Sequence, residues 1–182
     1  MQIETDRLML RAVEREDAGP THYWNRDPEV MRHLGGVTHP ELEAFTEFMG
    51  RIEAKYAAYR ERGLPWQAFV VFERESWRPI GTGIFKPIPD AEDRDMALVE
   101  IGWHLARHVW GRGYATEMGA ALRSHAFTVS AIDHVNALVD PANDASARVC
   151  ERLGMTERPG GLHCRYGDVR RFVTTRDAWA AS

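Results

Sequence analysis

Three β-rich segments follow one another without an intervening helix, and this order constrains the fold more than any other feature of the sequence. They cover residues 66–73, 79–86 and 97–105, and a short polar turn separates the first two. Neighbouring strands joined by short turns pair in antiparallel fashion. Segments with helical periodicity lie on both sides of this block. The sequence therefore predicts a mixed α/β sheet with antiparallel and parallel parts, not a strict strand–helix alternation.

The segments before this block are assigned from capping residues and apolar periodicity. A first strand is predicted over residues 7–13, and Asp27-Pro28-Glu29 is a strong helix start, with proline at the first helical position. Thr38-His39-Pro40-Glu41 has the spacing of a capping box ahead of a long helix that stops at Gly63. The apolar stripe of that helix comprises Leu42, Phe45, Met49, Ile52, Tyr56 and Tyr59.

The second half predicts a helix over residues 114–129, a strand over 134–140 and a helix from Asn143 to Gly154. A strand pair, or one strand with a tail, is expected over residues 166–179. A chain of 182 residues is the usual size of one domain, so we expect a single domain over residues 1–182.

Composition excludes several function classes. A net charge of −4 and a pI of about 6.1 argue against nucleic acid as a partner. The apolar runs are too short to cross a membrane, and the start does not resemble a signal peptide, so we expect a cytoplasmic protein. Cys150 and Cys164 fit no zinc or redox motif, and no metal site is expected. The oligomeric state stays open between monomer and homodimer.

A glycine-rich loop, Trp110-Gly111-Arg112-Gly113-Tyr114, stands between a predicted strand and a predicted helix. Glycine allows close backbone approach and positive φ, and a helix start offers unpaired N–H groups with a partial positive charge. Together these features can hold an anion. A plain tight turn is the simpler interpretation of the loop alone.

Two nucleotide-binding motifs fit this loop poorly. A P-loop requires Lys followed by Ser or Thr after its last glycine, whereas Tyr114 and Ala115 stand there. A dinucleotide fingerprint requires a third glycine, and Ala115 and Thr116 do not supply one.

The whole loop resembles the pyrophosphate-binding segment of the GNAT superfamily of N-acetyltransferases, and three further motifs match in order. Residues 5–11 (TDRLMLR) and 27–35 (DPEVMRHLG) are similar to the first strand and early helical segment of the ribosomal-protein-alanine N-acetyltransferase-like branch. Residues 143–155 (NDASARVCERLGM) are similar to its Asn-x-x-Ser helix. His108 stands where the superfamily often has Gln or Arg, and Met155 replaces the usual aromatic residue.

This resemblance implies a fold and a ligand. The expected fold is a central, mostly antiparallel sheet flanked by helices and splayed between its fourth and fifth strands. Acetyl-coenzyme A (acetyl-CoA) would enter the splay, and an amine acceptor would approach from the opposite side. The implied cofactor contacts are Trp103, His104, Leu105, His108, Gly111, Arg112, Gly113, Tyr114, Ala115, Thr116 and Asn143.

Two residues are the candidates for proton transfer. Glu100 would remove a proton from the amine, directly or through water. The alternatives are a structural carboxylate paired with an arginine, or a group that orients the substrate. Ser146 would donate a proton to the leaving thiolate, although it also fits the first turn of a helix capped by Asn143. Cys150 is better explained as a small buried apolar residue than as a nucleophile.

The residues that would select the acceptor are harder to predict from the sequence. Trp24, Trp66, Trp103 and Trp110 are candidates for the walls of the acceptor cleft, with core packing as the alternative. His104 is a candidate cleft residue, but a structural histidine is the favoured interpretation. The acidic residues Asp90, Glu92, Asp93 and Asp95 fit a solvated loop better than an amine-attracting one.

The resemblance predicts N-acetyl transfer from acetyl-CoA to a primary amine, either a protein N-terminus or a small molecule, within a ternary complex. Two alternatives remain. The donor can be another acyl-CoA such as succinyl-CoA, or the chain can be a CoA-binding sensor without turnover.

Overall fold

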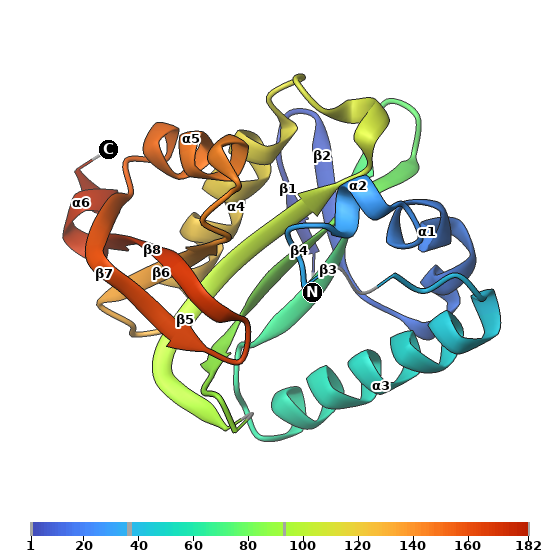
Figure 1. Cartoon of the computed structure of the whole chain (residues 1–182), viewed down its shortest axis with the longest axis horizontal. Helices are drawn as coiled ribbons and strands as arrows, with labels where there is room; N and C mark the ends of the chain where they lie inside the picture. Colours follow the sequence, from blue (N-terminus) through green and yellow to red (C-terminus); the bar gives the residue numbers. More distant parts are fainter. Residues whose placement is uncertain (1, 36–37, 93, 182) are drawn as a thin grey trace.

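The computed structural model describes residues 2–35, 38–92 and 94–181, and its centre is one eight-stranded sheet (Figure 1). The strand order is β1-β2-β3-β4-β5-β6-β8-β7, and every neighbouring pair is antiparallel except β5 and β6. This confirms the predicted mixed, mostly antiparallel sheet. The strands are β1 (Gln2–Glu4), β2 (Leu8–Ala12), β3 (Gln67–Glu73), β4 (Arg78–Pro89), β5 (Asp95–Leu105), β6 (His134–Val139), β7 (Thr156–Cys164) and β8 (Gly167–Thr175).

Helices flank this sheet, with α1 and α3 on one side of the view and α4, α5 and α6 on the other (Figure 1). Apolar residues of α3 pack against β3, whereas Met118 and Leu122 of α4 lie against β4 at Gly83. The helices are α1 (Ala18–Asn25), α2 (Pro28–Met31), α3 (Leu42–Glu61), α4 (Tyr114–Val129), α5 (Asp144–Arg152) and α6 (Arg176–Ala180). Short 3-10 turns precede α1 at Arg15–Asp17 and α4 at Arg107–Val109.

The two faces of β5 meet different layers. A Cβ on Gly119 of α4 would lie 3.3 Å from the ring of Trp103, so Trp103 faces α4. Successive strand residues point to opposite faces, so Glu100, Gly102 and His104 share the face that looks toward α3. Consistent with this, a Cβ on Gly102 would lie 2.9 Å from Ile84, which packs with the α3 cluster.

The sheet divides between β5 and β6. Within the fully described stretch from residue 94 to 181, the ladder joins these strands at Glu100 and Asn136 alone. Beyond that point they diverge, which confirms the predicted splay, because β5 and β6 are the fourth and fifth strands when the extra edge strand β1 is left out.

A buried asparagine holds the base of this fork. The amide of Asn136 donates to the carbonyl of Val99 at 2.7 Å, and its oxygen accepts from Nε of Arg171 at 2.8 Å. Both halves of the sheet are therefore joined through one fully buried side chain.

Some local predictions are wrong at helix starts. The proposed capping box does not form: Glu41 is the extended N-cap residue of α3 and makes no side-chain capping bond. The chain before it stays extended because the N–H of His39 bonds to Asn25 of α1, and the residue before a proline disfavours helix. Leu42, expected in the buried stripe, is 46% exposed as a result.

The C-terminal region holds more structure than expected. Strand β7 was not predicted, because its Arg158-Pro159-Gly160-Gly161 run lacks strand formers. It lies at the sheet edge, and its register against β8 shifts between Arg158 and Leu162, which accommodates this run. Helix α6, capped by Thr175, was also not predicted.

Candidate active site

The glycine loop leads directly into α4. Gly111 and Gly113 have φ of +77° and +81°, which favours glycine over other residues. Gly113 is the N-cap of this 16-residue helix, and no side chain caps it. The N–H groups of the first turn, at Tyr114, Ala115 and Thr116, therefore face outward from a helix end that carries a partial positive charge. This geometry supports the predicted anion site.

The first strand motif braces this loop. The hydroxyl of Thr5 and the backbone and side-chain N–H groups of Arg7 all donate to the Glu117 carboxylate in the first turn of α4. The guanidinium of Arg7 also donates to the carbonyl of Arg112 at 3.0 Å. Burial raises the pKa of Glu117, but these bonds outweigh it and lower the pKa. The N-terminal motif thus keeps Glu117 ionised but paired with Arg7, beside the predicted anion site.

Other predicted loop residues are placed on the surface. Arg112 and His108 are exposed, with an Arg112 nitrogen 3.8 Å from Oε1 of Glu73 and the His108 ring beside Tyr23. The hydroxyl of Tyr114 donates to the carboxylate of Glu73 at 2.6 Å, so this side chain anchors the start of α4 to β3. The first turn of α4 is also joined to α5, because Arg152 donates to Thr116 at 3.3 Å.

The β5 edge of the fork begins where the ladder to β6 ends. Trp103, His104 and Leu105 lie there with no ladder partner in β6. The carbonyl of Leu105 already accepts from the indole of Trp110 at 2.8 Å, which fixes the start of the glycine loop against the strand. Nε2 of His104 is buried without a hydrogen-bond partner, and burial lowers the pKa of His104 to about 4.

Glu100 stands at the base of the fork and is 4% exposed. Its Oε1 accepts from Nζ of Lys86, directly opposite on β4, at 2.5 Å. Nζ of Lys86 also donates to the hydroxyl of Tyr166 at 2.9 Å, and Tyr166 lies in the turn between β7 and β8. The predicted proton acceptor is therefore one member of a buried ion pair.

The helix after the fork keeps its predicted cap. Oδ1 of Asn143 accepts from the N–H of Ser146 at 3.1 Å, which leaves the amide group of Asn143 as a donor. Ser146 is half-buried in the first turn of α5. Cys150 is completely buried, and burial raises its pKa to about 12, as expected for an inert packing residue.

A family model described as an acetyltransferase (GNAT) domain matches residues 7–156. This chain belongs to the GNAT acetyltransferase family. An uncharacterised N-acetyltransferase, p20 of Bacillus licheniformis, is 30% identical over 152 residues, covering 82% of this chain and 79% of the relative.

Solved GNAT structures share the fold at low identity. Spermidine N-acetyltransferase from Vibrio cholerae, in complex with CoA and spermine, has a TM-score of 0.71 at 20% identity, covering 97% of this chain and 99% of that one. Ribosomal-protein-S5-alanine acetyltransferase from Vibrio fischeri has a TM-score of 0.72 at 19% identity, covering 98% of each chain. The fold alone therefore favours neither kind of acceptor.

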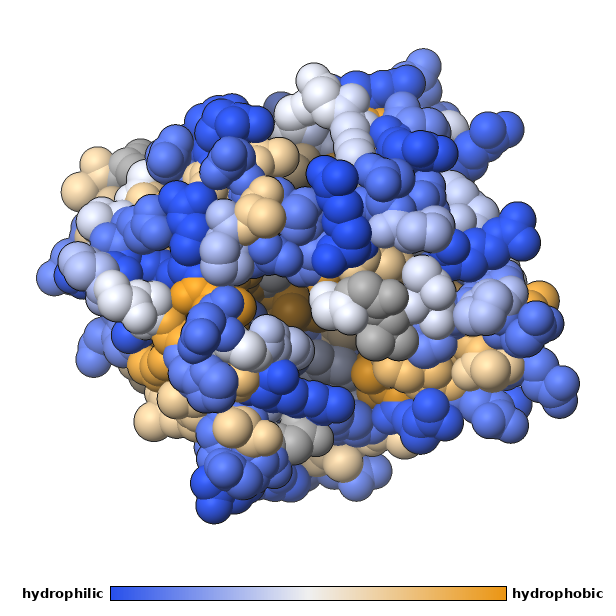
Figure 2. Space-filling view, viewed as in Figure 1, coloured by the Kyte–Doolittle hydropathy of each residue, from blue (hydrophilic) through white to orange (hydrophobic). Residues whose placement is uncertain are grey.

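One face of this GNAT domain is hollowed. Figure 2 shows a depression with apolar residues at its floor, between the surface over the β7–β8 hairpin and the surface over α1 and α3. Near this depression, Lys86 of β4 donates to Tyr166 of the β7–β8 turn, and Nδ1 of His33, after α2, lies 3.2 Å from Oδ2 of Asp140, after β6.

The expected acceptor walls are only partly present. Trp24 is 1% exposed and is a core residue, so its predicted place in the cleft wall is wrong. Trp66 is half-buried and packs edge-on against Phe85, and Trp110 is 46% exposed at the glycine loop. In the acidic loop, Arg94 pairs with Asp90 and Glu92, which favours the solvated interpretation; Asp93 lies outside the described residues.

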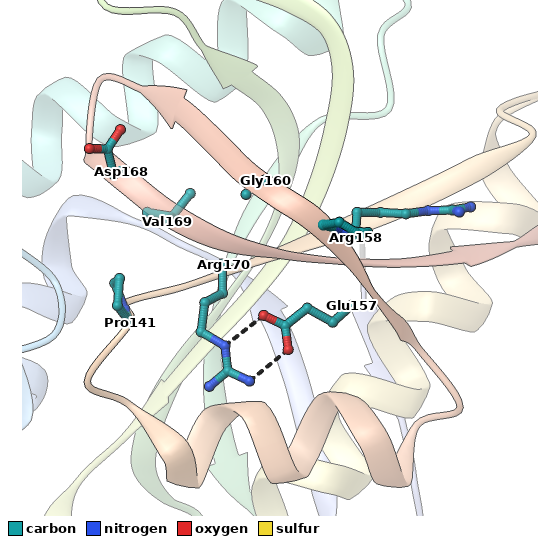
Figure 3. A pocket seen from close by; sticks show the side chains of 9 residues that line it. Pro141, Glu157, Arg158, Gly160, Asp168, Val169 and Arg170 are labelled. Carbon is teal, nitrogen blue, oxygen red and sulfur yellow. Dashed lines mark hydrogen bonds and ion pairs between the residues drawn. The ribbon is translucent and has the colours of Figure 1, made fainter.

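A second hollow, of about 330 Å³, lies on the β7–β8 hairpin (Figure 3). Pro141, Gly160 and Val169 line it, and a bidentate pair between Glu157 and Arg170 stands at its side. None of the predicted site residues lines it. In the described residues, no helix is long and apolar enough to cross a membrane, and no cluster of His, Cys, Asp or Glu is placed to hold a metal ion.

Lys86, Tyr166 and the fork residue Asn136 were not among the predicted site residues. Lys86 carried a weak signal: the chain has only two lysines among 23 basic residues, and this one lies in an apolar strand. Asn136 carried a similar one, as a polar residue inside a strand. Tyr166 precedes a glycine in a turn and carried none.

Proposed function

We propose that this chain transfers the acetyl group of acetyl-CoA to a primary amine, with both substrates bound together. The observation that carries the proposal is the continuity between the open β5 edge and the uncapped start of α4. The carbonyl of Leu105 and the indole of Trp110 join these two features directly. A single extended ligand with an anionic end fits along both of them.

The residues present fit such a ligand. The N–H groups after Gly113, with Arg112 beside them, would hold the pyrophosphate. The backbone of Trp103 and His104, and the free amide of Asn143, would hydrogen-bond the pantetheine arm. The thioester, when bound, supplies the acyl group to be transferred.

The amine would approach on the Glu100 face of β5. Glu100 would take a proton from the ammonium form, directly or through a water, and leave a nucleophilic amine. As the new C–N bond forms and the C–S bond breaks, Ser146 would donate its hydroxyl proton to the departing thiolate, and the second proton released by the amine nitrogen would restore that hydroxyl. Glu100 lies on β5, and Ser146 lies on α5, the helix that follows β6. The two groups would therefore reach the reacting atoms from opposite sides of the fork.

The finer proposal concerns the acceptor. The N-terminal TDRL segment and the Asn-x-x-Ser helix resemble the ribosomal-protein-alanine branch, which favours a protein N-terminus beginning with a small residue. A polyamine is the competing acceptor, because a structure of similar TM-score is named for spermidine N-acetylation.

A donor-by-acceptor screen with mass detection tests the proposal. Acetyl-CoA and succinyl-CoA are each offered with alanine-starting peptides, spermidine and spermine. We expect acetylation of at least one amine and little succinylation. Tight CoA binding with no acyl product from any pair would favour a sensor instead, and a preference for succinyl-CoA would overturn the donor assignment.

A further inference from the structure

Lys86 is held by contacts from three directions. Its ammonium group has three N–H donors. They reach Oε1 of Glu100 at 2.5 Å, the hydroxyl of Tyr166 at 2.9 Å and the carbonyl of Pro87 at 3.3 Å. The Lys86 and Glu100 side chains are 14% and 5% exposed. All three donors are thus used, and the two charged side chains are largely closed to water although Tyr166 is half exposed, which suits a permanently charged lysine.

The surroundings leave Lys86 as the group that balances the charge of Glu100. Burial raises the pKa of Glu100, whereas the ammonium group of Lys86 favours the ionised carboxylate. The groups facing the pair from α3 are the phenols of Tyr56 and Tyr59, and burial raises the pKa of both, so they stay neutral. Asp95 accepts the hydroxyl of Tyr59 at 2.9 Å.

Tyr166 links this pair to the other half of the sheet. It lies in the turn between β7 and β8, and its ring centroid is 5.4 Å from Nζ of Lys86. The hairpin is also fixed to β4 through its backbone, since the N–H of Arg165 donates to the carbonyl of Pro89 at 3.3 Å. The position of Lys86 therefore depends on both halves of the sheet beside the fork.

We propose that Lys86 is a positioning residue for the transfer reaction: it keeps Glu100 ionised and fixes its carboxylate at the fork, while Tyr166 holds Lys86 in place. This inference rests on the proposed function, because it concerns how Glu100 becomes able to accept a proton at neutral pH. Lys86 itself touches neither reacting atom.

The test is the pH profile of kcat/KM for Lys86→Met, Lys86→Arg and Tyr166→Phe. Removing a nearby opposite charge raises a carboxyl pKa by about 1–3 units. The acid limb of Lys86→Met should therefore move to higher pH by about one unit or more, so its rate loss is roughly ten-fold or more on that limb and shrinks as pH rises. Lys86→Arg should keep the limb near that of the parent, and Tyr166→Phe should move it less.

Lys55→Met is the matched control. Lys55 is the only other lysine of the chain, and it lies exposed on α3 over Tyr59. Its removal should leave the limb in place. A Lys86→Met variant that loses activity equally at every pH, or whose limb does not move, would overturn the inference and leave acetyl transfer intact.

A second measurement does not depend on turnover. In a double-mutant cycle of unfolding, Lys86→Met should lower the melting temperature more in the parent chain than in the Glu100→Gln variant. Equal losses in both backgrounds would contradict the coupling of the pair. If no amine is ever acylated while the coupling is present, the proposed function fails and the charge pairing stands.

Discussion

The two sides of the fork are built in different ways. The proposed cofactor side is one continuous segment, from the 3-10 turn at Arg107–Val109 into α4, whose shape depends on positive φ at Gly111 and Gly113. The proposed acceptor side is assembled from β4, β5 and the β7–β8 turn, with Lys86 and Tyr166 separated by 80 residues. The glycine loop is therefore determined by local backbone conformation, whereas the contacts of Lys86 form only once the sheet has folded.

The charges on the two sides also differ in exposure. The Arg7 side chain is 48% exposed where it meets Glu117, so its ion pair is partly screened by water. The Lys86–Glu100 pair is almost closed to solvent, so removing one partner would leave the other charge buried and unpaired. Substitutions on the cofactor side should therefore act mainly on binding, and those on the acceptor side on both stability and rate.

The largest expected effect is on the cofactor side, from Gly113→Trp. The new side chain would fill the space in front of the α4 N–H groups and strain a backbone with φ of +81°. We expect CoA affinity to fall by at least about 100-fold. Thermal shift measures it, because a ligand at 100 times its dissociation constant adds about 2.7 kcal/mol to the parent chain.

Gly154→Trp is the control for this substitution. Gly154 also has positive φ, +70°, but follows α5 with open space around it. A similar loss of CoA affinity in both variants would show that strain, not the anion site, explains the effect, and the loop assignment would fail.

Glu100→Gln should give the next largest effect, on the acceptor side. Loss of a proton acceptor lowers turnover by about 100-fold or more, while CoA affinity stays within about two-fold. Rates are measured below the melting temperature of the variant, because Lys86 loses its buried partner. Glu157→Gln removes an exposed carboxylate and should change neither quantity. An unchanged rate for Glu100→Gln from about pH 6 to 9 would exclude Glu100 as the base.

A smaller effect is expected from Arg7→Ala. The variant loses the bonds to Glu117 and to the carbonyl of Arg112, and it leaves a negative charge beside the anion site. We expect CoA affinity to fall several-fold and turnover at saturating CoA to stay unchanged, since exposed pairs contribute roughly 1 kcal/mol or less. Arg94→Ala breaks a more exposed pair, in the acidic loop, and should leave affinity unchanged. If the parent chain and Arg7→Ala bind CoA equally tightly, the contacts of Arg7 do not contribute to the anion site of the glycine loop.

The same contrast explains what the sequence could predict. Helix α4 begins and ends where expected, at Tyr114 and Val129, because glycine punctuation and apolar periodicity are local signals. The splay and its flanking strands also match the expected order. The contacts among Lys86, Glu100 and Tyr166 could not be predicted, because they depend on register and on a hairpin whose edge strand β7 lacks strand formers.

Two site residues, Glu100 and Trp24, show how far the role of a single residue can be predicted from sequence. One predicted alternative for Glu100 was a structural carboxylate paired with an arginine; the structure shows a paired carboxylate, but its partner is Lys86. Trp24 was a candidate for the wall of the acceptor cleft, but it is a core residue. The residue type alone could not decide this, because tryptophan serves both core packing and the lining of clefts. The residues that a side chain contacts depend on the tertiary structure, so they cannot be predicted from its residue type.

The smallest expected effect, at Asn143, lies where the two sides meet. Asn143→Asp keeps an oxygen to accept from the N–H of Ser146, so stability should change little, but it loses the amide donor and gains a charge next to the fork. CoA affinity should then fall a few-fold. Asn143→Ala loses the cap as well and should cost about 1 kcal/mol of stability. Unfolding and CoA titration of both variants separate the two roles. If Asn143→Asp binds CoA as tightly as the parent chain, Asn143 is a helix cap alone, and the cofactor side ends at the glycine loop and the β5 edge.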